Sequence, residues 1–165
     1  MIFVTVGTHE QPFNRLIKKI DDLVANGDIK EKVIVQTGFS TYVPKHCEAY
    51  KMMSFDEMQQ ALKDARIVIT HGGPSSFIEA LQYGKVPIVV PRQEKFREHV
   101  NNHQVDFTKL IAERMNNIIP VYDIDNLKKT IDDYDEIAIT KSHGESSNNK
   151  QFNEQLEKIV NDLSK

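Results

Sequence analysis

The chain alternates between short apolar runs and longer amphipathic segments from its first residue to its last. The apolar runs predict buried strands, and they lie at residues 2–6, 32–36, 50–53, 67–70, 86–90 and 118–121. The segments between them carry apolar residues at helical spacing and predict helices at 12–24, 54–64, 74–83, 98–114, 123–133 and 150–164. Strands that alternate with helices are typical of an α/β fold.

Local signals support several of these boundaries. Ser54 and Glu57 have the spacing of a capping box, Gly84 ends the helix before it, and Asp123 is a suitable N-cap. Apolar strands joined by crossover helices predict a Rossmann-like parallel sheet with helices on both faces. We expect one domain over 1–165, with a polar linker near 141–149. The amphipathic helix at 150–164 packs on its own domain or docks onto a partner chain, and the pattern favours neither.

In such a sheet, ligands bind beyond the carboxyl ends of the strands. Three segments rich in small or polar residues follow predicted strands, at 7–10, 71–76 and 92–104. Because the strand ends meet at one edge of the sheet, we expect these three segments to converge. The sequence therefore predicts a binding site at this edge.

The segment at 71–76 consists of His71, Gly72, Gly73, Pro74, Ser75 and Ser76. Glycines let the backbone approach a ligand closely, and proline suits the first position of a helix. The free N–H groups of that helix start can bind a phosphate. Glu79 follows about one and a half turns later, where it can accept hydrogen bonds from sugar hydroxyls. The alternative is a plain glycine turn with Glu79 on a solvated face.

The other two segments also carry candidate chemistry. The amides of Gly7 and Thr8, with the Thr8 hydroxyl, can hold a phosphate, and His9 can transfer a proton. An ordinary turn with a surface histidine is an equal alternative. In the third segment the basic side chains can neutralise a diphosphate, and Glu98 and His99 can bind sugar hydroxyls. The basic residues are Arg92, Lys95 and Arg97.

A second set of interpretations is weaker. His99 and His103 stand four residues apart, which suits a metal, but no third ligand is evident and a metal site is disfavoured. In the loop at 36–42, Phe39 or Tyr42 is a candidate for stacking on a base, and a plain loop is as good an interpretation. The sequence contains neither a GxGxxG fingerprint nor a GxxxxGK[ST] loop, which disfavours the common dinucleotide and P-loop sites.

Composition narrows the class of protein. The net charge is −3, which argues against nucleic-acid binding. The single cysteine, Cys47, excludes an intrachain disulfide and a cysteine-based zinc site. The first residues form a strand rather than a signal peptide, and no apolar run is long enough to cross a membrane. We therefore expect a cytoplasmic protein.

The chain resembles the C-terminal, donor-binding domain of family 28 glycosyltransferases over nearly its whole length. Three stretches carry the resemblance: residues 3–8 (FVTVGT), residues 71–75 (HGGPS) with Glu79, and Pro91-Arg92 with residues 98–104 (EHVNNHQ). Residues 6–11 and 98–100 look most like capsular β-1,4-galactosyltransferase subunits of bacteria. The eukaryotic subunit that adds the second N-acetylglucosamine to dolichol diphosphate looks more distant.

This resemblance implies one half of a GT-B enzyme, which binds a UDP-sugar while a separate membrane-associated subunit binds a lipid-linked saccharide. That partner would recruit the chain to the inner face of the membrane. By the family pattern, Gly7, Thr8 and the amides of 73–76 meet the diphosphate, and Glu79 meets the ribose. Glu98, His99 and Gln104 would meet the donor sugar. Many relatives carry an acidic residue or glutamine followed by glutamine where this chain has Glu98-His99, which leaves the sugar open.

The predicted reaction is an inverting transfer from the UDP-sugar, with galactose in a β-1,4 linkage as the first choice. UDP-glucuronate and UDP-N-acetylglucosamine are alternative donors. His9 and Glu98 are the predicted catalytic residues; His9 is the first candidate for the base, and the partner is the other source. We expect no cofactor and no metal, because no DxD-like metal-holding motif lies in a suitable loop. The DxD-like stretch Asp123-Ile124-Asp125 starts a peripheral helix. A non-catalytic sugar-nucleotide-binding or enhancer subunit, or an epimerase or hydrolase, are the competing interpretations.

Overall fold

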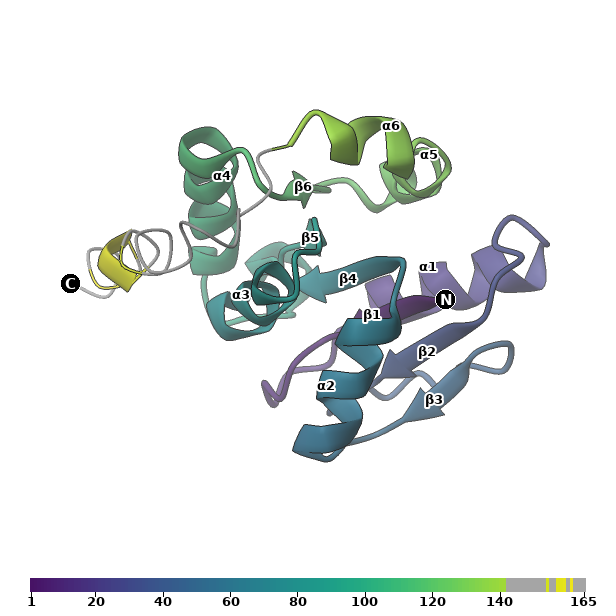
Figure 1. The fold of residues 1–165 in the computed structure, drawn as a ribbon. Helices are drawn as coiled ribbons and strands as arrows, with labels where there is room; N and C mark the ends of the chain where they lie inside the picture. Colours follow the sequence, from purple (N-terminus) through teal and green to yellow (C-terminus); the bar gives the residue numbers. More distant parts are fainter. Residues whose placement is uncertain (142–153, 155–156, 160, 162–165) are drawn as a thin grey trace.

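A computed structural model describes residues 1–141, 154, 157–159 and 161 (Figure 1). Its centre is one six-stranded sheet with the order β3-β2-β1-β4-β5-β6, in which every neighbouring pair is parallel. The strands are β1 (Ile2–Thr5), β2 (Val33–Gln36), β3 (Glu48–Tyr50), β4 (Ile67–His71), β5 (Ile88–Val90) and β6 (Ile119–Pro120). This is the strand order of a Rossmann fold, and it confirms the predicted α/β class.

Helices cover both faces of the sheet, as Figure 1 shows. They are α1 (Asn14–Ala25), α2 (Phe55–Asp64), α3 (Pro74–Gln82), α4 (His103–Met115), α5 (Leu127–Asp132) and α6 (Tyr134–Ile139). Two short 3₁₀ turns, η1 (Glu94–Phe96) and η2 (Ile124–Asn126), complete the fold. Among these described elements, no helix is long and apolar enough to cross a membrane.

Alternation along β1 explains the two layers of the core. Ile2 and Val4 point to the face that α1, α5 and α6 cover, where they pack with Ile17 and Leu127. Phe3 points to the opposite face and packs against α2 and α3. A strand that is buried on both faces carries consecutive apolar residues, which is why the sequence shows runs rather than alternation.

The strand register places the candidate loops side by side. Thr5 at the end of β1 lies opposite Gln36 of β2 and Thr70 of β4. After β1 the chain continues to β2 on one side of it, whereas after β4 the chain continues to β5 on the other side. The strand order therefore reverses between β1 and β4. The loops that follow β1 and β4 therefore flank the crevice where this class of sheet binds ligands.

Most predicted boundaries are confirmed to within a few residues, and Ser54 with Glu57 forms the predicted capping box. The third strand begins earlier than predicted, at Glu48 rather than at residue 50. The helix predicted at 98–114 begins only at His103, because Arg97 adopts a left-handed conformation (φ 58°) and turns the chain away. The separate helix α6 was not predicted.

The predicted linker and C-terminal helix lie largely outside the described residues. Ile159, which is described and helical, is buried in the apolar cluster that α3 and α4 share. This contact agrees with packing on the chain's own domain at that one position. Docking of the helix onto a partner chain stays an open prediction.

Candidate functional site

The candidate site lies at the switch point between β1 and β4. Gly73 is the N-cap of α3 and Pro74 is its first residue, and no side chain caps this helix start. Ser75 is exposed and Ser76 is half-buried, so the first turn faces the open side of the loop. The positive end of the helix dipole and an uncapped N–H group suit an anion, as the sequence predicts.

The imidazole of His71 fills the space between Gly7 and Gly73. A Cβ on Gly7 would lie 2.3 Å from Nε2 of His71, and a Cβ on Gly73 would lie 2.2 Å from its Cε1. Gly7 also has φ +73°, which side chains other than glycine rarely adopt. These glycines are therefore required by the buried imidazole as well as by any ligand above them.

His71 is 6% exposed, and its hydrogen bonds define a neutral ring. Its Nδ1 accepts from the Gly73 N–H (3.2 Å) and from the Gln104 side-chain amide (3.2 Å). Nε2 therefore carries the proton and donates to Oγ of Ser76 at 3.0 Å. Burial, and then the nearby charge of Arg92, lower the pKa of His71 to about 3. The structure thus places His71 beneath the glycine turn, where it orders the start of α3.

Gln104 joins three elements of the site. Its Oε1 accepts from the backbone N–H of Gly72 (3.0 Å) and from that of Arg92 (3.0 Å), while its amide donates to His71. A Cβ on Gly72 would lie 2.9 Å from Cβ of Gln104, so glycine is needed for this approach. The side chain is buried and its polar atoms are occupied. Its predicted contact with the donor sugar would replace one of these bonds and stays a prediction.

Arg92 is completely buried and bonded to backbone carbonyl groups. Its terminal nitrogens donate to the carbonyl oxygens of Gln11 (2.6 Å), Val6 (2.7 Å) and Glu98 (3.0 Å). The guanidinium carbon lies 5.0 Å from the centre of the Phe13 ring. Burial lowers the pKa of Arg92 to about 10, which still keeps it charged at neutral pH. The structure places Arg92 as a brace between the loop after β1 and the loop after β5, and its predicted contact with a diphosphate stays a prediction.

Glu98 forms a buried ion pair with Arg15 of α1. Its two carboxylate oxygens accept from Nε and a terminal nitrogen of Arg15, each at 2.9 Å, and one also accepts from the Gln93 N–H at 3.1 Å. The side chain of Glu98 is 3% exposed. Both oxygens accept hydrogen bonds within the protein, and the predicted catalytic role and sugar contact of Glu98 stay predictions.

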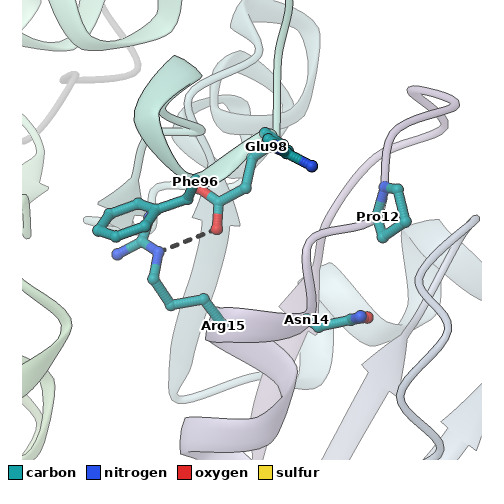
Figure 2. A pocket seen from close by; sticks show the side chains of 6 residues that line it. Pro12, Asn14, Arg15, Phe96 and Glu98 are labelled. Atoms are coloured by element: carbon teal, nitrogen blue, oxygen red, sulfur yellow. Dashed lines mark hydrogen bonds and ion pairs between the residues drawn. The ribbon is translucent and has the colours of Figure 1, made fainter.

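A surface pocket of about 500 Å³ lies beside this ion pair. It is lined by Pro12, Asn14, Arg15, Phe96, Arg97 and Glu98. In Figure 2 the side chains of Arg15 and Glu98 meet across the pocket, and the Phe96 ring lies beside the guanidinium. The Arg15 guanidinium carbon is 4.6 Å from the centre of that ring. The pocket thus joins the start of α1 to the loop that follows β5.

His9 and His99 meet across the same edge of the sheet. Their rings are stacked, with centroids 4.5 Å apart and planes inclined by 11°. Burial, followed by the charges of His9 and Arg92, lowers the pKa of His99. The structure brings together these two predicted residues, while Thr8 beside them is exposed. His9, the predicted base, is therefore packed against another side chain rather than exposed on an isolated loop.

Glu79 is half-buried on α3, and burial raises the pKa of its carboxyl group. Among the described residues we find no hydrogen bond or ion pair to this carboxylate. Its predicted ribose contact stays a prediction. Tyr42, by contrast, donates to the buried Asp21 at 2.7 Å, so the ring is held in the fold, whereas Phe39 is 45% exposed.

A metal site is not apparent in the part of the chain that the structure describes. No group of three or more histidine, cysteine, aspartate or glutamate side chains is arranged there to hold an ion. His99 lies before the start of α4 and His103 is its first residue, so the two do not share a helix face.

Sequence reasoning did not identify Arg15 and Gln11 as members of the site. Arg15 stands in the first turn of a helix, where the dipole disfavours a cation, and this placement signals a carboxylate partner. Gln11 lies in the loop between β1 and α1 but has no residue-type signature of its own. Its role depends on a contact with His9 that only the folded chain shows.

The chain is similar in sequence to glycosyltransferases. The sequence model described as the glycosyltransferase family 28 C-terminal domain matches residues 1–163. Two curated relatives, from Mus musculus and Homo sapiens, are both named "UDP-N-acetylglucosamine transferase subunit ALG13". Each is 34% identical, over 65% and 66% of this chain and over 9% and 10% of the relative. The chain spans only about a tenth of these relatives, and they lend no support to the expected likeness to capsular galactosyltransferases.

Solved structures agree with the fold. A glycosyltransferase of kitacinnamycin superimposes with a TM-score of 0.59 at 15% identity. The matched region covers 83% of this chain and 34% of that glycosyltransferase. MurG of Acinetobacter baumannii superimposes with a TM-score of 0.57 at 15% identity. The matched region covers 83% of this chain and 43% of the MurG chain. These identities are too low to indicate more than the fold. The chain corresponds to one half of a two-domain GT-B architecture.

Proposed function

Because the chain belongs to the glycosyltransferase family 28 C-terminal domain family, we propose that it is the donor-binding, catalytic half of a UDP-sugar-dependent transferase. The observation that carries this proposal is the uncapped start of α3 beside Gly7, at the point where the strand order reverses. The diphosphate would bind there, on the amides after Gly73 and on Thr8. Glu79, one and a half turns further, would accept from the ribose hydroxyls.

A partner chain is the proposed source of the acceptor half of the reaction. One domain of this size forms only one wall of a GT-B cleft, and both curated relatives are named as subunits. We propose that a membrane-associated subunit supplies the acceptor wall and a lipid-linked saccharide, and that it recruits this chain to the cytoplasmic face. N-acetylglucosamine is the donor sugar that the relatives' names favour. Galactose, which the sequence resemblance implies, is the alternative.

The proposed chemistry is a single displacement with inversion. The acceptor hydroxyl forms a bond to the anomeric carbon while its proton passes to a base, for which His9 is our candidate. The bond from that carbon to the β-phosphate oxygen breaks, and UDP leaves with the electron pair. The helix start of α3 would stabilise the charge that develops on UDP. We propose that no metal is needed, and loss of turnover in EDTA with recovery in manganese would contradict this.

Binding of UDP to the isolated chain tests the site. In titration calorimetry, Glu79→Gln should weaken UDP binding by about tenfold, the effect of losing one or two charge-assisted hydrogen bonds. Glu136→Gln, on the exposed surface of α6, is the matched control and should bind as the unaltered chain does. Equal affinity of the two variants would remove Glu79 from the ribose site.

Turnover tests the enzyme class. The chain is combined with membranes that contain its acceptor subunit, and UDP release is measured with UDP-N-acetylglucosamine, UDP-galactose and UDP-glucuronate in separate reactions. Release with one donor, dependent on both subunits and abolished by His9→Asn, supports the proposal. Binding of UDP without turnover of any donor would favour a non-catalytic binding subunit. Turnover of a donor without the partner would favour a hydrolase or epimerase.

A further inference from the structure

The side-chain amide of Gln11, in the loop that follows β1, forms hydrogen bonds with two neighbours. Its Nε2 donates to the carbonyl oxygen of Arg97 at 3.4 Å, so its Oε1 is turned the other way. That oxygen lies 2.9 Å from Nε2 of His9. A carboxamide oxygen only accepts hydrogen bonds, so Nε2 of His9 carries the proton. In the neutral ring this leaves Nδ1 of His9 with a free lone pair.

The His99 ring stacks against one face of the His9 ring. The two rings are nearly parallel at 4.5 Å, which fixes the plane of His9. His99 is itself oriented, because its Nδ1 accepts from the Asn101 N–H at 3.4 Å. Burial, followed by the charges of His9 and Arg92, lowers the pKa of His99. The surroundings therefore favour a neutral His99 ring.

We propose that Gln11 is a positioning residue: it holds His9 in the Nε2–H tautomer, with the ring plane set by His99, so that Nδ1 is the atom that accepts the acceptor's proton. This inference rests on the proposed function, in which His9 is the base. The arrangement is that of a base oriented by a third group, with an amide in place of a carboxylate. Among the described residues no hydrogen bond to Nδ1 of His9 is found, which leaves this atom free for the acceptor hydroxyl.

The role of the Gln11 side chain is separable from that of its backbone. Arg92 bonds the main-chain carbonyl of Gln11, so substituting the side chain leaves this brace in place. Gln11→Leu removes the acceptor at a similar volume. Gln11→Glu keeps an acceptor oxygen towards His9 and loses the donor to Arg97. Gln60→Ala on the exposed surface of α2 is a control for the loss of a glutamine amide elsewhere.

Tautomers are read directly from the side-chain nitrogen resonances of histidine in ¹⁵N-labelled full-length chain. At neutral pH His9 should show the Nε2–H pattern in the unaltered protein, in Gln11→Glu and in Gln60→Ala. Gln11→Leu should show averaging of the two tautomers. An Nδ1–H pattern for His9 in the unaltered chain, or no change in Gln11→Leu, would overturn the inference whatever the activity.

Turnover with the partner subunit gives the second measurement. Gln11→Leu should lower kcat by about tenfold to a hundredfold with little change in KM for the donor, and Gln11→Glu should recover most of the rate. Full kcat in Gln11→Leu, while His9→Asn is inactive, would overturn the positioning role alone. Full kcat in His9→Asn would instead overturn the base assigned in the proposed function.

Discussion

Acidification tests whether His71 is buried as a neutral ring beneath the glycine turn. Its pKa is lowered to about 3 in the folded chain, whereas an exposed histidine in the unfolded chain titrates near 6.5. A lowered histidine pKa means that the unfolded state binds a proton that the folded state does not. The free energy of unfolding is therefore fully retained above pH 6.5 and falls as the pH drops towards 3. At pH 5.0 the loss is about 2 kcal/mol from this residue alone.

Urea unfolding followed by circular dichroism, at pH 7.5 and pH 5.0, measures this loss. The matched variant is His71→Asn, which keeps an acceptor oxygen for the Gly73 N–H but cannot be protonated. Its loss on acidification should be smaller than that of the unaltered protein by about 2 kcal/mol. His99, whose pKa is also lowered, acts in the same direction in both proteins and cancels in the difference. The carboxylates with lowered pKa values, such as Asp21 and Glu31, act only at lower pH.

Equal losses in the two proteins, within about 0.5 kcal/mol, would refute the buried neutral His71. If His71→Asn does not fold, the side-chain resonances of His71 in the unaltered chain decide the question. They should show a neutral ring with the proton on Nε2 at pH 5.0. A protonated ring at that pH would refute the same reasoning.

Urea unfolding at neutral pH tests three further substitutions, two in the candidate site and one at the start of α2. Gly7→Ala should destabilise the fold by at least about 1 kcal/mol more than Gly27→Ala, because both have positive φ but only Gly7 faces His71, at 2.3 Å from an added Cβ; equal losses would contradict the close approach. Arg15→Met should cost about 3–5 kcal/mol, since it leaves the Glu98 carboxylate buried without its partner, and Arg15→Met with Glu98→Gln should cost less. Ser54→Ala should cost about 1 kcal/mol through loss of the capping box, and no loss would show that this cap contributes nothing.

The fold follows from features that are local in the sequence. Apolar runs mark the strands on both faces of a parallel sheet, and the capping box at Ser54 marks the start of α2 within one residue. The start of α4 could not be located in this way, since the residue types at 98–102 are compatible with a helix. Arg97 turns the chain in a left-handed conformation, and the Glu98 carboxylate after it is held by Arg15, which is 83 positions away in the chain. Long-range contacts of this kind leave no local signal.

The convergence of three loops at one edge was also predictable, because parallel strands place their carboxyl ends together. The sequence did not predict which polar residues in those loops are bonded within the protein and which are free to bind a ligand. Glu98, Arg92 and Gln104 have the residue types expected of ligand-binding groups, yet all three are buried and bonded within the protein. Residue type reports what a side chain can bind, but only the packing decides whether it is free to do so.

The physical reason for this division lies in the strand ends. Where β1, β4 and β5 end, their last backbone groups leave the sheet while still buried, and each needs a hydrogen-bond partner. Arg92 supplies donors to the carbonyl of Val6, and Gln104 supplies an acceptor to the amide of Gly72. Thr8 is exposed and Glu79 is half-buried, and we propose that groups of this kind contact the substrate. Urea unfolding and UDP titration of the same variants should therefore agree for Arg92 and Gln104, whose substitution lowers both the free energy of unfolding and UDP affinity, whereas substitutions at Thr8 and Glu79 should lower affinity alone.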